Sequence, residues 1–166
     1  MAGKTYTIKK GEHYSNHTPK MCYGKGVMRV TFKFMDGCWF PLEVQDDYAI
    51  NKLCGWSAGL HRRNSVRCGW TPNKEPGKID LFFYLYINGV RKEQKFTTVE
   101  IGLEYDLKID LANNLCAFTL QRDGATVATD SVYYPQPRCP FGYWLFPYVG
   151  GRLPARVDTK IYLDIH

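Results

Sequence analysis

The sequence has no long apolar run, and this absence excludes one class of protein. No stretch approaches the roughly 18 consecutive apolar residues that a membrane-spanning helix requires. The first 20 residues also contain no apolar segment of the kind found in secretory signal peptides. We therefore expect a cytoplasmic protein that has no membrane partner.

The sequence also lacks the short motifs that mark several enzyme and binding classes. It contains no Walker A loop, no dinucleotide-binding glycine fingerprint and no RRM signature. Gly55–Gly59 fits the spacing GxSxG, but a nucleophile elbow needs a strand, a sharp turn and a helix within an α/β sheet. Because no segment has helical periodicity, we do not interpret Ser57 as a hydrolase nucleophile.

The cysteines and histidines lack the spacing of a metal site. The chain has six cysteines but no CxxC pair, and zinc sites usually contain such pairs. His13, His17 and Cys22 fit no closed site either. We therefore expect no metal and no cofactor. Reduced cysteines in an intracellular protein are our default expectation, and three disulfides in a secreted protein are the alternative.

What the sequence has in abundance is alternation of apolar and polar residues. In residues 157–165 the apolar positions recur every second residue, as in a strand with one buried face and one wet face. The same pattern, or a continuous apolar run, predicts further strands. The expected strands cover residues 27–35, 79–87, 90–101, 104–111, 115–122, 125–133 and 157–165.

Turn residues separate these segments. Asn88-Gly89, Asn113-Asn114 and Asp123-Gly124 are two-residue hairpin signals, because Asn, Asp and Gly tolerate positive φ. They indicate an antiparallel meander over residues 79–133. Prolines 135, 137 and 140 indicate one irregular crossing between strands, and short helical turns are allowed near 46–54.

The predicted fold follows from these signals. We expect an all-β chain, an antiparallel two-layer β-sandwich of the jelly-roll, concanavalin-like kind, with about ten strands and little or no helix. No linker or repeat divides the sequence, so residues 1–166 are expected to form a single domain.

The charge balance favours acidic ligands. Lys and Arg number 22 against 16 Asp and Glu, which gives a formal net charge of +6 and an isoelectric point near 9.0. Such a chain suits acidic sugars, phosphates, or an acidic protein, while nucleic acid is a weaker candidate that remains open. Solubility alone is the alternative explanation of the charge.

One segment concentrates residues that recognise anions. If residues 61–67 are extended, His61, Arg63, Ser65 and Arg67 point the same way and can converge on a carboxylate or phosphate. The aromatic positions Tyr84 and Tyr86 lie on the second face of a strand whose two faces are both apolar, where they either stack on a ligand ring or are covered. The full candidate set for ligand binding is Trp56, Ser57, His61, Arg63, Ser65, Arg67, Trp70, Tyr84 and Tyr86.

One set of segments comprises residues 51–57, 64–70 and 144–151, with Pro154-Ala155 and the closing strand. Together these segments resemble an uncharacterised group of hypothetical proteins from gut Bacteroidetes and their phages. The resemblance implies a concanavalin-like jelly roll, and a host cytoplasm as location if a phage encodes the chain. Arg62 and Arg156 stand where the group has histidines, which weakens the transfer of a histidine-based site to this chain. The group implies no activity.

Three functional hypotheses remain at this point. The first is a non-enzymatic binding module for an acidic or sugar-like ligand, such as a glycan or a phosphate-bearing small molecule. The second is a phage- or host-associated interaction or inhibitor protein, with a homo-oligomer left open. The third is a carbohydrate-active enzyme, which requires paired carboxylates or a Tyr/His/Arg set within one groove.

Overall fold

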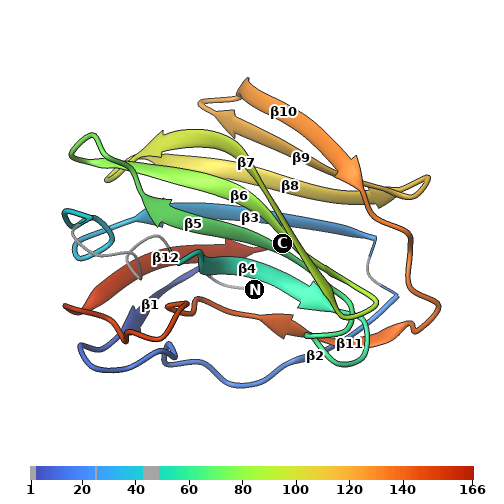
Figure 1. Ribbon diagram of the computed structural model, residues 1–166. Helices are drawn as coiled ribbons and strands as arrows, with labels where there is room; N and C mark the ends of the chain where they lie inside the picture. The colour runs from blue at the N-terminus through green and yellow to red at the C-terminus, as the bar shows by residue number, and fades with distance from the viewer. Residues whose placement is uncertain (1–2, 25, 43–48) are drawn as a thin grey trace.

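The computed structural model describes residues 3–24, 26–42 and 49–166 and contains twelve β-strands. The strands form two antiparallel sheets of six strands each, packed face to face as a β-sandwich (Figure 1). Their bounds are β1 Lys4–Ile8, β2 Met21–Tyr23, β3 Val27–Phe34, β4 Asn51–Ser57, β5 Ser65–Pro72, β6 Lys78–Ile87, β7 Val90–Glu100, β8 Glu104–Ala112, β9 Leu115–Arg122, β10 Ala125–Tyr133, β11 Phe141–Leu145 and β12 Thr159–Ile165.

The order of the strands places distant parts of the chain side by side. The first sheet has the order β1-β12-β3-β8-β9-β10, and the second has the order β2-β11-β4-β5-β6-β7. The expected meander is therefore wrong in one respect, because it is split between the sheets. Strands β6 and β7 belong to the second sheet, and the chain crosses to the first sheet between Glu100 and Glu104.

The predicted hairpins are confirmed by the backbone. Asn88, Asn113 and Asp123 have φ values of 49°, 53° and 52°, and each is followed by a second residue with positive φ. Positive φ at both central positions is the geometry of a type I′ turn, whose twist matches that of the flanking strands. The proline-rich residues 134–140 form the predicted irregular crossing, which leads from β10 in one sheet to β11 in the other.

The core lies between the two sheets. Alternate residues of each strand point inward, so the buried apolar set draws on both sheets and includes stacked rings such as Phe83 on Phe118, at 4.1 Å between centroids. Five of the six cysteines are buried and all six are free thiols, and Cys116 is fully buried, as its alternating segment predicts. Thiols in this core act as small apolar groups.

Helix is absent from the part of the chain that the structure describes, and there no helix is long and apolar enough to cross a membrane. The allowed helical turns near 46–54 fall partly on residues 46–48, which lie outside the described residues. From residue 51 onward that expectation is wrong, because Asn51–Ser57 is the fully buried strand β4.

Candidate functional site

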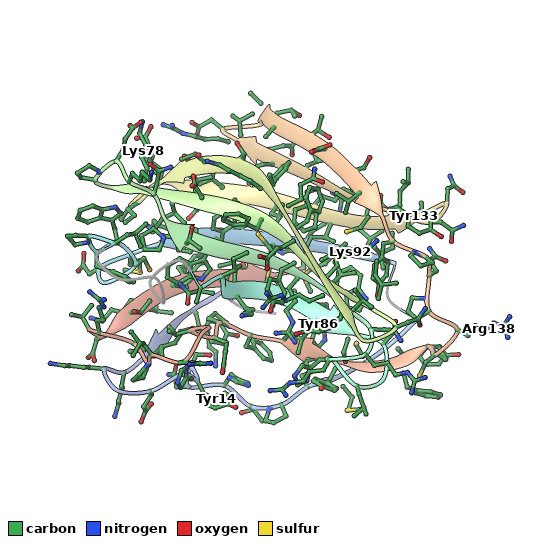
Figure 2. All side chains as sticks on the ribbon, in the orientation of Figure 1. Tyr14, Lys78, Tyr86, Lys92, Tyr133 and Arg138 are labelled. Carbon is green, nitrogen blue, oxygen red and sulfur yellow. The ribbon has the colours of Figure 1, made fainter. Side chains whose placement is uncertain are left out.

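A groove of about 520 Å³ runs over the outer face of the second sheet. Its floor comes from strands β4, β5, β6 and β11. Its other walls come from the N-terminal loop, which is the connection between β1 and β2, from the β4–β5 connection and from the loop after β11. Figure 2 labels Tyr14 and Tyr86, which line the groove from the N-terminal loop and from β6. The lining also includes His17, Pro19, Lys52, His61, Arg62, Arg67, Tyr84, Tyr143, Trp144, Leu145, Phe146, Pro147, Tyr148 and Gly151.

Strand alternation decides which residues reach this face. On β5 and β6, Val66 and Leu85 pair with each other and point into the core, so their neighbours Arg67 and Tyr84 point outward. Arg67 and Tyr84 are themselves directly paired across the two strands. Lys52 reaches the same face because β4 has a register shift between Lys52 and Cys54. The register shift thereby places the Lys52 side chain outward, although every residue of β4 is buried.

Two buried cations share the floor of the groove. Arg67 and Lys52 are each 8% exposed. Lys52 Nζ lies 4.5 Å from the centroid of the Tyr84 ring, and the Arg67 guanidinium carbon lies 6.0 Å from the same centroid. Within the described residues neither cation forms a salt bridge, and Arg67 Nε has no hydrogen-bond partner. Buried charges without a counter-ion are unfavourable, and an anionic ligand relieves that cost.

The environment of Lys52 lowers its pKa to about 8. Burial is the largest cause, because it disfavours the charged ammonium, and the positive charges of Arg67 and Arg91 act in the same direction. Glu93 opposes them weakly. Lys52 Nζ donates a hydrogen bond to the carbonyl of Ile50 at 2.5 Å, and the ring of Tyr148 lies 5.6 Å away on another side.

A histidine and a tyrosine meet beside the two cations. His61 Nδ1 lies 2.5 Å from the Tyr143 hydroxyl oxygen, and the backbone N–H of His61 donates to the same oxygen at 3.3 Å. With its proton assigned to Nδ1, the imidazole leaves Nε2 free to accept a proton. The tyrosine oxygen then accepts two hydrogen bonds, and its own O–H is free to donate to a ligand. Burial, followed by the charges of Arg67 and Arg62, lowers the pKa of His61.

Two serines hold His61 and Tyr143 in place and do not face the groove. Ser57, 2% exposed, accepts a hydrogen bond from the backbone N–H of Tyr143 at 3.0 Å. Ser65, fully buried, donates to the carbonyl of His61 at 2.7 Å. Both were predicted as ligand-binding residues. Their burial removes them from direct contact with a ligand, and they act through the residues that they position.

The predicted extension of residues 61–67 is wrong. Residues 61–63 form a turn, in which the N–H of Arg63 donates to the carbonyl of Leu60 at 2.8 Å, and the strand begins only at Ser65. The four residues expected on one side therefore diverge. His61 and Arg67 line the groove, whereas Arg63 is exposed outside it. A hairpin connection between the adjacent strands β4 and β5 requires this reversal.

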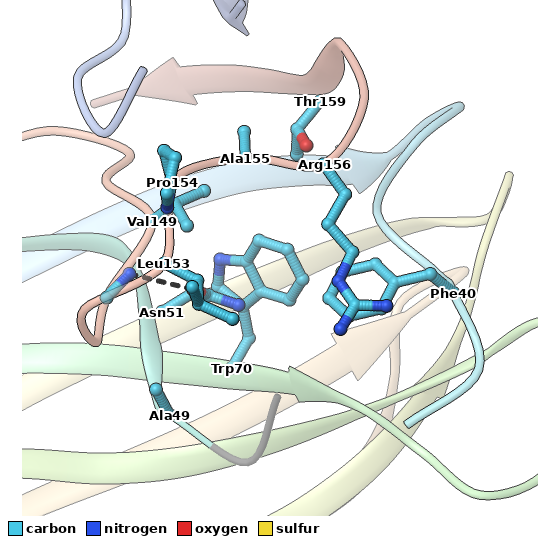
Figure 3. A pocket seen from close by; sticks show the side chains of 11 residues that line it. Phe40, Ala49, Asn51, Trp70, Val149, Leu153, Pro154, Ala155, Arg156 and Thr159 are labelled. Carbon is cyan, nitrogen blue, oxygen red and sulfur yellow. Dashed lines mark hydrogen bonds between the residues drawn. The ribbon is translucent and has the colours of Figure 1, made fainter. Parts of the chain in front are cut away.

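The predicted stacking role of Trp56 and Trp70 is also wrong. Trp56 is 4% exposed and packs in the core. Trp70 is 1% exposed and contacts Phe34 from the opposite sheet at 5.2 Å between centroids. Figure 3 shows Trp70 beside a separate cavity of about 30 Å³, which it lines with Asn51 and Arg156. That volume holds about one water molecule, so it is no ligand site.

The aromatic row of β6 lies on the outer face, as the pattern of that strand predicts. Tyr84 and Tyr86 both line the groove, with ring centroids 6.0 Å apart. Tyr86 is partly exposed, whereas Tyr84 is 5% exposed because Lys52 and Arg67 lie over its ring. Tyr86 thus offers a stacking surface, and Tyr84 supports the two cations.

Sequence reasoning named only His61, Arg67, Tyr84 and Tyr86 among the residues that line the groove. Those it missed include four with a polar or aromatic group that a ligand can contact, namely Tyr14, Lys52, Tyr143 and Tyr148. None of these four left a signal in the sequence: residues 141–145 show no alternation of apolar and polar types, and only their burial in β11 alternates, with Tyr143 on the outer side. Lys52 is placed by a register shift, and Tyr14 and Tyr148 lie in loops joined by an isolated bridge. Among the described residues no group of three His, Cys, Asp or Glu side chains could hold a metal ion.

Comparisons with known proteins support the architecture of the chain. No protein-family model and no curated protein matches this sequence. Among solved structures, an alginate lyase from Klebsiella pneumoniae is similar with a TM-score of 0.65 and 12% identity, over 85% of this chain. This chain spans only 59% of the length of that lyase.

Two further solved structures are similar over nearly the whole chain. An exolytic PL7 alginate lyase from Zobellia galactanivorans has a TM-score of 0.61 and 11% identity. The match covers 97% of this chain and 83% of the lyase chain. A functionally unknown protein from Saccharomyces cerevisiae has a TM-score of 0.57 and 10% identity, with coverages of 99% and 87%. At these identities the likeness shows the fold alone. The fold is the jelly-roll β-sandwich of such lyases, consistent with the predicted concanavalin-like architecture.

Proposed function

We propose that the groove binds an acidic polysaccharide, with a uronate carboxylate held between Arg67 and Lys52. The observation that carries the proposal is the pair of buried cations on the groove floor, both without an acidic partner among the described residues. Arg67 supplies a planar fork that suits a carboxylate, and Lys52 supplies a second charge within reach of the same tyrosine ring.

The shape and lining of the groove favour a sugar chain as its ligand over a compact anion. The groove is open to solvent and lies along the sheet face, and it carries the partly exposed ring of Tyr86 as well as Tyr14. Aromatic rings stack on the apolar faces of sugar rings, while charged groups select the carboxylates. Alginate, the substrate named for the similar lyases, is a polymer of uronates and belongs to this chemical class.

A matched pair of arginine variants tests the binding proposal. Isothermal titration with alginate and polygalacturonate is run for the wild type, Arg67→Gln and Arg63→Gln. Arg67 lies on the groove floor, and Arg63 is an exposed neighbour outside it. We expect Arg67→Gln to lose about thirtyfold or more in affinity, as for truncation of a buried charge partner. Arg63→Gln should bind like the wild type. Equal affinity of both variants, or wild-type protein that binds no polyuronate, refutes the proposal.

A second candidate function is cleavage of the bound chain by β-elimination, and the contact between His61 and Tyr143 favours it. Elimination removes the proton at C5, next to the carboxylate, and expels the glycosidic oxygen at C4, which leaves a C4=C5 double bond. His61 Nε2 accepts the C5 proton, and the Tyr143 hydroxyl donates a proton to the departing oxygen. Arg67 and Lys52 stabilise the negative charge that develops on the carboxylate. The non-enzymatic module remains the outcome if only binding is found.

Ultraviolet absorbance of the new double bond distinguishes the two candidates. We expect the absorbance to rise when wild-type protein is mixed with polyuronate. The rate of this rise should be at least about a hundredfold lower for His61→Gln. Because the pKa of His61 is lowered by burial and by Arg67 and Arg62, the imidazole stays neutral below its ordinary pKa of 6.5. The acidic limb of kcat/KM should accordingly lie below pH 6.5. No absorbance change with a bound polyuronate would remove the lyase candidate and leave binding.

A further inference from the structure

Three exposed apolar side chains form a patch at one edge of the second sheet. Met21, Tyr23 and Phe141 are 71%, 67% and 61% exposed. Tyr23 and Phe141 are paired across β2 and β11, and their rings meet edge to face at 5.1 Å between centroids. We call these three residues the edge patch. Side chains this large and this exposed are unusual as a contiguous group and point to contact with a ligand.

The edge patch continues the wall of the groove. Met21 pairs with Tyr143, and Tyr143 lines the groove and contacts His61. Phe141 is two residues before Tyr143 on β11, so both side chains leave the same face of the sheet about 6.8 Å apart along the strand. Residues 143–148 all line the groove. Phe141 is therefore the next outward position of the same strand, just beyond the end of the groove.

We propose that the edge patch is a further sugar-binding subsite, which holds the next units of the acidic polysaccharide that occupies the groove. This inference rests on the proposed binding function. The patch has two aromatic rings and a thioether but no charged member, so it contacts the apolar face of a sugar ring and not its carboxylate. Selection for uronates then comes from Arg67 and Lys52, while the edge patch contributes affinity only for longer chains.

The position of the patch favours a sugar chain over a second protein. A polysaccharide that leaves the groove past Tyr143 along β11 next meets Phe141 and Tyr23, because these side chains lie on the same outer face. Two rings set edge to face also present a small angled surface, which suits one or two sugar rings. A second copy of this chain on the exposed strand β2 is the main competing occupant, and the test includes it.

The test measures binding of oligouronates of increasing length to the wild type, to Tyr23→Ala/Phe141→Ala and to Tyr133→Ala. Tyr133 is a matched control, because it is 61% exposed on β10 of the other sheet. We expect the double variant to bind the shortest oligomers like the wild type and to lose about tenfold in affinity for the longest. Tyr133→Ala should match the wild type at every length. Thermal unfolding of all three proteins verifies that the exposed substitutions leave the fold intact.

Each outcome of this experiment has a defined meaning. Equal affinity of the wild type and the double variant for long oligomers overturns the edge patch as a subsite and leaves the groove proposal standing. Wild-type protein that binds no oligomer of any length refutes the groove proposal, and the subsite with it. If light scattering finds a dimer that the double variant abolishes, the patch is an interface between copies and the subsite is also overturned.

Discussion

Replacement of Lys52 by methionine should make the protein more stable near neutral pH while it removes affinity for acidic ligands. Lys52 is 8% exposed, and its ammonium has no acidic partner among the described residues. Methionine has a similar length and carries no charge, so it suits the space beside the rings of Tyr84 and Tyr148. A binding residue kept at the expense of stability is a common feature of functional sites.

The expected gain in stability of Lys52→Met follows from the pKa of Lys52. That pKa is about 8 in the folded protein and 10.5 ordinarily, and this difference corresponds to about 3 kcal/mol against the folded state when the amine is charged. Methionine also loses the hydrogen bond to the Ile50 carbonyl, which is a loss of about 1 kcal/mol. The variant should therefore be more stable by about 2 kcal/mol near pH 7, a rise in Tm of about 4–8 °C.

The pH dependence gives the sharper test. Because the folded pKa lies below the unfolded one, wild-type stability increases as the pH rises from about 8 to 10.5, while the ammonium deprotonates first in the folded protein. Arg67 and Arg91 also lower the pKa of Lys52, and guanidinium groups keep their charge through this range. The advantage of Lys52→Met should shrink across the range and reverse above it.

Urea denaturation at several pH values measures this difference directly. Both proteins share every other titrating group, so the difference in their free energies of unfolding isolates Lys52. A variant that is less stable than the wild type near pH 7, or a difference that does not change with pH, refutes the reasoning. In that case Lys52 is not a destabilising buried charge.

Three further predictions concern the core, the thiols and the support of the site. Phe83→Ala should lower the free energy of unfolding by about 3–5 kcal/mol in urea titrations, because Phe83 is 1% exposed and stacks on Phe118 at 4.1 Å. A loss below about 1 kcal/mol would contradict the packing. In the native protein only the exposed Cys139 should react quickly with a thiol reagent, and the other five cysteines only after unfolding, as a colorimetric thiol assay will measure. Gly142→Ala should destabilise by about 1–3 kcal/mol and weaken polyuronate binding, because an added Cβ would lie 1.8 Å from the Ser57 carbonyl oxygen and displace Tyr143; unchanged unfolding and binding curves count against this contact.

Seven of the twelve strands in the described residues, namely β3, β6 to β10 and β12, could be read from the sequence because their signals are local. Alternation over residues 104–111 and 115–122 agrees with β8 and β9 to within one residue, and the Asn and Asp turns have the positive φ that their residue types favour. The point where the chain changes sheets was not readable. Strands β7 and β8 are separated by three residues, as in a hairpin, but pair with different neighbours.

The candidate site was only partly predictable, because its residues are brought together by strand pairing and not by local sequence. Arg67, His61, Tyr84 and Tyr86 were named in advance and do line the groove. Trp56 and Trp70 were named with them because aromatic residues near arginines resemble a binding surface, but inward positions of β4 and β5 place both in the core. No short-range pattern distinguishes an inward from an outward face when every residue of both strands is buried.

The sequence by itself determined seven of the strands, the hairpin turns, the all-β class and the positive charge, because each depends on neighbouring residues or on composition. Only the tertiary structure decided that Lys52 lies beside Arg67, and that His61 meets Tyr143 from a strand 82 residues later in the chain. These contacts arise from pairing between β4, β5 and β11 and from one register shift. Pairing partners and register depend on how the two sheets bury their shared faces, which is a property of the whole chain.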